Sequence, residues 1–253
     1  MAFSEEARSY ADTRKRTGAE YVKFTPAYRT VLRILNPAAK TVWKHFISEG
    51  NNGKGMGAVC PNIPGESYVC PVELKYAGLP KEHEERRANN ARRKFMVNVL
   101  DRTPYTICKS CLTLTPGKIN AAANSKVCVS CEESLKGHDF KPLNKVKILE
   151  QGPRLFNQSL NAIQQMQFEE LGKDIVDYDI TFTTQGIGRD RVITAIPQDP
   201  KPLEEDAFLD ADTNEPQKLF DLDLLAEPSS VEEITLLLQG ATIDQINLLK
   251  GVE

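Results

Sequence analysis

Four cysteines in the middle of the chain have the spacing of a metal-binding module. They form two C-x-x-C pairs, one at Cys108 and Cys111 and the other at Cys128 and Cys131, with sixteen residues between the pairs. Four thiolates close a tetrahedral zinc site and leave no position for a catalytic water. The pattern therefore predicts one structural Zn²⁺. The alternative for a C-x-x-C pair is redox chemistry, but that motif normally opens a helix in a thioredoxin-like βαβ unit, which this sequence lacks.

Two further cysteines carry a weaker pattern. Cys60 and Cys70 each precede a proline, and nine residues separate them. No third or fourth ligand stands close by in the sequence, so we do not predict a second zinc site. His45 and His83 could contribute ligands, although isolated histidines more commonly belong to the core or the surface.

The sequence offers little that could catalyse a reaction. It has no nucleophile elbow, Walker loop, H-E-x-x-H or deaminase motif. The glycines Gly186 and Gly188 lack the third glycine and the following helix of a dinucleotide site. With only three histidines in the chain, we predict a binding protein and not an enzyme.

The composition is that of a globular protein. Of the 253 residues, 40% are hydrophobic and 26% are charged, and no apolar run reaches the roughly 18 residues of a membrane span. The first residues lack the features of a secretory signal. We therefore expect a cytoplasmic protein with reduced cysteines, which favours metal ligation over disulfides.

Charge is distributed unevenly along the chain. Residues 1–197 carry 29 Lys and Arg against 21 Asp and Glu, whereas residues 198–253 carry 3 against 14. A basic body suits a polyanionic partner, and an acidic tail could compete with that partner. The alternative is that the tail only improves solubility.

Periodicity predicts a mainly β protein with a few helices. Strands are expected where β-branched and aliphatic residues cluster, and the last two should form a hairpin. An exposed helix is expected over the charged residues 81–94, and a packing helix over residues 153–171, which begin with a proline. The expected strands are 29–36, 41–47, 95–100, 145–149, 176–182 and 191–196.

These elements suggest three regions. Residues 1–20 form a flexible basic arm, and residues 21–197 form the core, with the cysteine module inserted at about 105–135. Residues 198–253 form an acidic tail that is largely disordered by composition. Within the tail, residues 219–225 and 231–249 are rich in aliphatic side chains, and Ser230 with Glu233 forms a capping-box pattern.

Aromatic and basic residues alternate in the predicted strands, as single-stranded nucleic-acid binding requires. Bases stack on aromatic rings while Lys and Arg contact phosphates. About half of the aromatics should instead belong to the core. The stacking candidates are Tyr28, Trp43, Phe46 and Tyr105. The phosphate-contact candidates are Arg29, Arg33, Lys44, Arg92, Arg93 and Lys94.

The order of these elements resembles that of the single-stranded DNA-binding proteins of tailed phages. The resemblance covers about residues 24–197 and departs from the family at Glu73, where the C-P-x-C pattern would place a cysteine. The four-cysteine insertion is closer to the zinc ribbon in an OB-fold of the large subunit of replication protein A. The resembling segments are V-L-R-I-L at 31–35, V-C-P at 59–61 and 69–71, F-M-V-N-V-L at 95–100, V-K-I-L-E at 146–150, Y-D-I-T at 178–181, G-I-G-R-D at 186–190 and V-I-T-A-I-P at 192–197.

The resemblance implies a fold and a function. The fold would be a five-stranded OB-type barrel with an inserted four-cysteine zinc ribbon. The protein would coat and protect single-stranded DNA during phage DNA replication, recombination and repair, in the cytoplasm of the bacterial host. The acidic tail would recruit replication and recombination proteins. The arm residues Arg14, Lys15, Arg16 and Thr17 would support self-association along the DNA.

Two other functions remain open at this point. A zinc-ribbon adaptor for transcription or assembly would bind proteins, with the tail as its main working part. A binder of double-stranded DNA or of RNA is the other, although the sequence has no helix-turn-helix pair or two-Cys, two-His finger.

Overall fold

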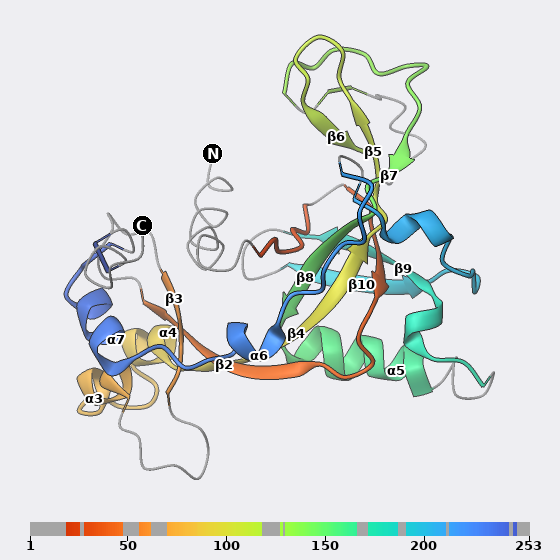
Figure 1. The fold of residues 1–253 in the computed structure, drawn as a ribbon. Coiled ribbons are helices and arrows are strands. Elements are labelled where there is room, and N and C mark those ends of the chain that lie inside the picture. Colours follow the sequence, from red (N-terminus) through yellow and green to blue (C-terminus); the bar gives the residue numbers. More distant parts are fainter. Residues whose placement is uncertain are drawn as a thin grey trace. The chain divides into compact units, whose positions relative to one another are not determined.

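The chain divides into two compact units in a computed structural model (Figure 1). The first unit comprises Met1–Ala19, Lys40–Met96 and Asp221–Glu253, and the second comprises Glu20–Ala39 and Val97–Phe220. The structure describes residues 19–25, 28–47, 56–61, 70–117, 127–128, 130–165, 172–186, 191–210, 213–242 and 245–246.

The second unit is built around antiparallel strands. Strand β1 lies between β9 and the last residues of β4, and β10 pairs with the other edge of β9. Strand β8 pairs with β4 as well. These strands follow the predicted β-branched and aliphatic runs. Their bounds are β1 Thr30–Ile34, β4 Arg92–Asp101, β8 Lys145–Gln151, β9 Asp179–Gln185 and β10 Val192–Pro197.

Strand β9 is buried more completely than its alternating sequence predicts. Its polar residue Asp179 accepts ion pairs from Arg33 Nε at 2.8 Å and from Arg102 Nε at 3.0 Å. Thr181 accepts hydrogen bonds from Arg29 and Gln198. Because these polar groups are paired, both faces of the strand can be buried without leaving unsatisfied charge.

A helical segment follows β8 in the second unit. It begins as a π-helix, η2, at Arg154–Leu160 and continues as α5 at Asn161–Ile163. Leu155, Phe156, Leu160 and Ile163 are buried, as the predicted packing helix requires. The short 3-10 helix η5, Ile175–Asp177, then leads into β9.

The cysteine module is inserted between β4 and β8. It carries a separate sheet in the order β6-β5-β7, at one end of the second unit (Figure 1). Its strands are β5 Pro104–Ile107, β6 Leu114–Pro116 and β7 Lys141–Pro142.

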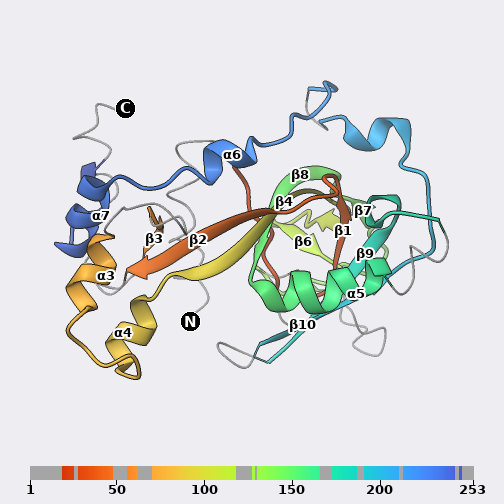
Figure 2. The same cartoon turned by 90° about the horizontal axis from the view of Figure 1, so that it is seen from below.

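The first unit combines a small sheet with short helices. Strand β2 pairs with β3 on one side and with the first residues of β4 on the other. Helices α3 and α4 lie near the end of β2 (Figure 2). The bounds are β2 Lys40–Ile47, β3 Met56–Val59, α3 Pro71–Tyr76 and α4 Glu84–Asn89.

The acidic part of the chain differs from the expectation of a largely disordered tail. Its described residues include the 3-10 helix η7, Glu205–Phe208, and the helices α6, Leu222–Leu225, and α7, Val231–Leu238. Ala207 is buried in the second unit, while Ile234 and Leu237 are buried in the first. Aliphatic residues at helical spacing supply enough apolar surface to offset the cost of ordering these segments.

The mainly β prediction is confirmed, with one boundary corrected. The charged residues predicted as a helix over 81–94 are helical only at 84–89, and Arg92–Lys94 belong to β4 because they pair with β2. The arm at 14–17 and much of the turn at 186–188 lie outside the described residues. No helix in the described ranges is long and apolar enough to cross a membrane.

Candidate metal centres and nucleic-acid interface

The four module cysteines converge as the sequence predicts. The Sγ atoms of all four lie within 4.8 Å of one another, with Cys108 and Cys131 at 3.6 Å and Cys111 and Cys128 at 3.4 Å. A tetrahedral zinc with Zn–S bonds of about 2.3 Å would place its sulfurs about 3.8 Å apart. All four cysteines are free thiols. The set could therefore hold one tetrahedrally coordinated metal ion.

The two C-x-x-C pairs adopt the same backbone turn. The amide of Leu112 donates to the carbonyl of Cys108, and the amide of Glu132 donates to the carbonyl of Cys128. Leu112 and Glu132 have positive φ values of 57° and 59°. A left-handed conformation costs about 1 kcal/mol or more in residues with a side chain. Each turn contains one such residue, and its conformation directs the two sulfurs of its C-x-x-C pair toward one point.

Hydrogen bonds within the cluster shift the pKa of Cys128 and the pKa of Cys131 in opposite directions. Hydrogen bonds from the amides of Cys131 and Ser130 lower the pKa of Cys128 to about 6. The pKa of Cys131 rises to about 12 despite a bond from the Glu133 amide, because it shares hydrogen bonds with the neighbouring thiols. Four thiolates cannot crowd together without a cation, since like charges oppose ionisation. The cluster could therefore hold a metal ion, whose charge would allow its thiols to ionise together.

The described residues of the module form only a small hydrophobic core. Its hydrophobic core consists of Cys108, Cys128 and Leu135, with Cys111 and Phe140 partly buried against them. An apolar core of this size contributes little to folding, so metal binding supplies the stability of such modules.

A second group of metal-ligand side chains lies in the first unit. The ligand atoms of His45, Cys60 and Cys70 also lie within 4.8 Å of one another, and all three residues are buried. The sequence interpretation did not predict this site, because Cys60 and Cys70 are not arranged as a knuckle. Strand pairing brings them together: His45 lies opposite Ala58, two residues before Cys60, and the amide of Cys60 donates to the carbonyl of Trp43 at 2.8 Å.

The histidine of this group is oriented as a ligand. Its Nδ1 lies 2.7 Å from the carbonyl oxygen of Asn89, while Nε2 lies 3.2 Å from Cys70 Sγ. A metal-bound histidine typically donates its other ring N–H to such a carbonyl, which fixes the tautomer. Nε2 is thus the atom available to a metal ion.

Electrostatics within the group favour the thiolate, the ligating form, of Cys70. A hydrogen bond with Cys60 and another with His45 lower the pKa of Cys70 to about 4, although burial opposes this shift. Burial also lowers the pKa of His45, but its bonds to Cys70 and Asn89 outweigh burial and raise it. A thiolate beside an imidazole is a soft-donor pair that suits zinc or a similar cation. Among the described residues, the group has three members.

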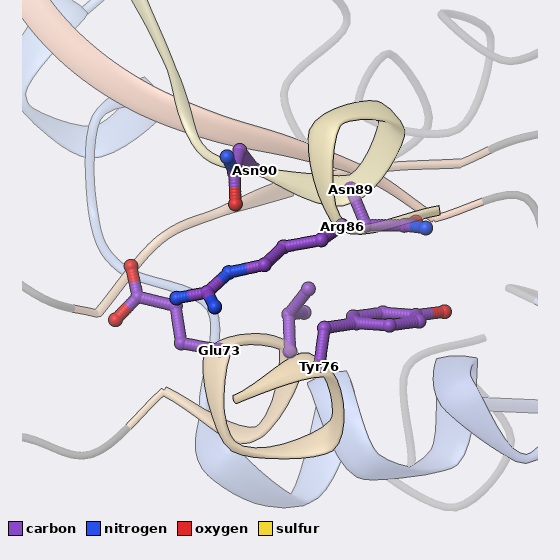
Figure 3. Close-up of a pocket in the computed structure, with 6 residues that line it drawn as sticks. Glu73, Tyr76, Arg86, Asn89 and Asn90 are labelled. Atoms are coloured by element: carbon purple, nitrogen blue, oxygen red, sulfur yellow. The ribbon is translucent and has the colours of Figure 1, made fainter. Parts of the chain in front are cut away.

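A small pocket lies beside this second group. Val72, Glu73, Tyr76, Arg86, Asn89 and Asn90 line it. Glu73 stands where a second cysteine of a C-x-x-C pair would be, and the Arg86 side chain extends across the pocket toward it (Figure 3). Helix α4 therefore supplies both the Asn89 carbonyl that orients His45 and the cation facing Glu73.

Six of the predicted nucleic-acid contacts belong to β2 and β4 of the first unit. Trp43 and Phe46 are 37% and 47% exposed, which is unusual for aromatics of this size. Trp43 pairs with Arg93, and Lys44 pairs with Arg92, across the two strands. The other member is Lys94, which pairs with Val42. Because side chains alternate along a strand, Trp43 and Arg93 project from one face of this strand pair, and the other four residues project from the opposite face. We call the six residues of the two faces, Trp43, Lys44, Phe46, Arg92, Arg93 and Lys94, the β2–β4 surface.

The remaining predicted contacts belong to the second unit and differ among themselves. Arg29 is exposed and donates to Thr181, whereas Arg33 is only 4% exposed and is held by Asp179. Arg33 is therefore an internal ion-pair residue and not a surface contact to phosphate. Tyr28 and Tyr105 are half-buried, and burial is the main cause of the raised pKa of each hydroxyl.

Comparison with protein-family models and with curated proteins found no match to this chain.

Proposed function

We propose that the protein binds single-stranded DNA through the β2–β4 surface. The observation that carries this proposal is that each face of the strand pair exposes one aromatic ring beside cations. Trp43 lies beside Arg93 on one face, and Phe46 lies on the face of Lys44 and Arg92. Aromatic faces stack with bases of any sequence, and neighbouring Lys and Arg side chains neutralise phosphates.

The fold in this proposal is an OB-type barrel. Five strands of the second unit, β1, β4, β8, β9 and β10, form one paired series among the described residues. The cysteine module is inserted between β4 and β8, and the helical segment η2–α5 follows β8. Folds of this type commonly bind single strands and oligosaccharides.

The metal at the four cysteines would be one structural Zn²⁺. Cys108, Cys111, Cys128 and Cys131 would hold it, and four thiolate ligands would leave no open position for a substrate. The zinc would stabilise the module and take no part in a reaction, in keeping with a binding protein in a reducing cytoplasm.

Partner recruitment by the acidic segment would use its exposed aliphatic side chains. Leu219 and Leu224 are 45% and 51% exposed, beside Asp221 and Asp223. An acidic segment with exposed leucines suits replication and recombination proteins that carry basic, apolar grooves. Self-association along DNA through residues 14–17 belongs to the same proposal.

Titration with matched oligonucleotides tests the proposal. The chain contains one tryptophan, so quenching of its fluorescence by oligo-dT reports directly on stacking at Trp43. Binding to the single strand should be tight and salt-sensitive, with a duplex of equal length binding much more weakly. If all four cations of the β2–β4 surface contact phosphates, log K against log salt should have a slope of about −3. Equal binding to both DNA forms would contradict the proposal.

A protein-binding adaptor is the second candidate function, and one observation favours it. Ile107 and Leu114 are paired across the module's strands and are 57% and 43% exposed, while Leu112 is 78% exposed. Exposed aliphatic residues on a small module are typical of protein interfaces. An adaptor should show little DNA binding at physiological salt, so the same titration separates the two functions.

A further inference from the structure

Helix α7 and the His45–Cys60–Cys70 group share one hydrophobic core. Cys60 and Cys70 pack in the same cluster as Ile234, Leu237 and Ile246, and the exposures of all five lie between 0% and 4%. The end of the acidic segment therefore packs in the same core as two of the three metal-ligand side chains. Neither part can open to solvent without uncovering the other.

Backbone contacts fasten the same two parts together. The amide of Ser229 donates to the carbonyl of Val59 at 3.1 Å, and the hydroxyl of Ser229 accepts from the amide of Val59 at 3.2 Å. Val59 directly precedes Cys60. The next residue, Ser230, caps α7 by accepting from the amide of Glu233 at 3.1 Å. The start of α7 is thus fixed to the strand end that positions a ligand.

The other end of the group is connected to α7 through helix α3. Cys70 is the N-cap residue of α3, which packs against α7 (Figure 1). Cys70 therefore lies at the start of a helix that packs against α7, and Cys60 follows the strand residue that is bonded to Ser229, just before α7. A change in the geometry of the group changes the surface on which the helix rests.

The buried group is costly to maintain without a metal ion. Three metal-ligand side chains lie buried with their ligand atoms within 4.8 Å of one another, so each brings a polar group into an apolar core. A thiophilic divalent cation neutralises the thiolates and fixes the relative positions of β2, β3 and α3. A metal that binds only the closed compartment stabilises every contact that closure requires, including those of α7.

We infer that a zinc-class divalent cation at His45, Cys60 and Cys70 holds the acidic segment 221–246 docked on the first unit, and that loss of the cation releases it. The released segment would present the apolar face of α7 together with the acidic residues Glu227, Glu232 and Glu233. Metal occupancy would then decide whether this segment is part of the fold or a free acidic arm. The inference stands apart from the proposed DNA binding, since it concerns only contacts within the first unit.

Hydrogen–deuterium exchange of the full-length protein tests the inference with Zn²⁺ as the ligand. If α7 undocks only after the metal leaves, exchange of its amides slows by the factor 1 + [Zn]/Kd, about 100-fold at 100 times the Kd. Amides of β9 in the second unit provide an internal reference. Helix docking and zinc binding are coupled in both directions. If Leu237→Ala raises the equilibrium constant for undocking of α7 by some factor, it should therefore lower the zinc affinity of this group by the same factor.

Two double variants assign the effect to one metal group. With Cys60→Ala and Cys70→Ala, exchange in α7 should be fast and independent of zinc. With Cys108→Ala and Cys111→Ala, the zinc response of α7 should persist. The inference is overturned if α7 in the wild-type protein exchanges equally with zinc and with chelator. It is also overturned if removing Cys108 and Cys111 abolishes the response, or if β2 loses protection together with α7, which would indicate unfolding of the whole unit.

Discussion

Replacing Trp43 with alanine should weaken single-stranded DNA binding by an amount that the structure limits. Stacking of one base on an aromatic ring is worth about 1–3 kcal/mol. Trp43 is 37% exposed, so one part of the indole is available to a base while the rest packs on the protein. We therefore expect the lower end of that range, a loss of about 5- to 20-fold in affinity.

Fluorescence anisotropy of labelled oligo-dT measures this loss across a salt series. Trp43 carries no charge, so Trp43→Ala should lower log K by the same amount at every salt concentration. Arg92→Ala should instead reduce the magnitude of the salt slope by about 0.7, because one phosphate contact is removed from a single strand. Arg92 is a better choice than Arg93, whose guanidinium covers the Phe95 ring at 4.7 Å and would expose it if removed.

Matched variants separate stacking from stability. Trp43→Phe keeps an aromatic face and should retain most of the affinity, whereas Trp43→Leu keeps apolar bulk and should not. Circular dichroism melting of each variant checks that β2 remains folded. Affinity within twofold of the wild type for Trp43→Ala, in a folded protein, would refute the assignment of Trp43 to the interface.

Three further predictions follow from other contacts. Cys108→Ala should remove one equivalent of tightly bound zinc, measured by atomic absorption. It should also make the module sensitive to limited trypsin digestion, because the apolar core of the module is too small to fold without a metal ion. The pKa of Glu204 is lowered from 4.5 to about 2 by hydrogen bonds from Lys201, from its own backbone amide and from Arg102. Because the folded-state pKa is lowered, this pairing stabilises the fold above pH 4.5, and the stabilisation is lost as the pH falls toward 2. Acid unfolding of Glu204→Gln should accordingly be shallower over that interval than that of the wild type. Asp223→Asn frees Lys40 from its exposed ion pair and should raise DNA affinity at low salt by less than about threefold, an effect that 0.3 M salt abolishes.

The sequence was sufficient wherever a local pattern determines the local structure. The run Val31–Ile34 and the nearly continuous apolar residues 95–100 became strands because β-branched and aliphatic side chains suit a sheet buried on both faces. The two C-x-x-C pairs each specify a knuckle whose geometry depends on five or six consecutive residues. Their convergence was predictable from spacing alone.

Features that depend on strand pairing were not accessible from the sequence. Arg92–Lys94 look like the end of a charged helix, yet pairing with β2 makes them a strand. Likewise, His45 and Cys60 meet because β2 and β3 are antiparallel, and Cys70 joins them from the start of α3. The only local signal for this group was the placement of each cysteine before a proline, which does not identify a partner.

The acidic tail, residues 198–253, shows why average composition wrongly predicts disorder for a whole region. Residues 198–253 have a net charge of −11, but Leu225, Ile234, Leu237 and Ile246 are each at most 3% exposed. Deleting the segment would remove part of the core of the first unit, so a truncated protein could not distinguish competition for DNA from unfolding. Competition must instead act through exposed pairs such as Lys40 with Asp223, where one substitution changes charge and leaves the core intact. If Asp223→Asn leaves low-salt affinity unchanged while Arg92→Ala lowers it, the acidic segment serves the fold and does not compete for the β2–β4 surface.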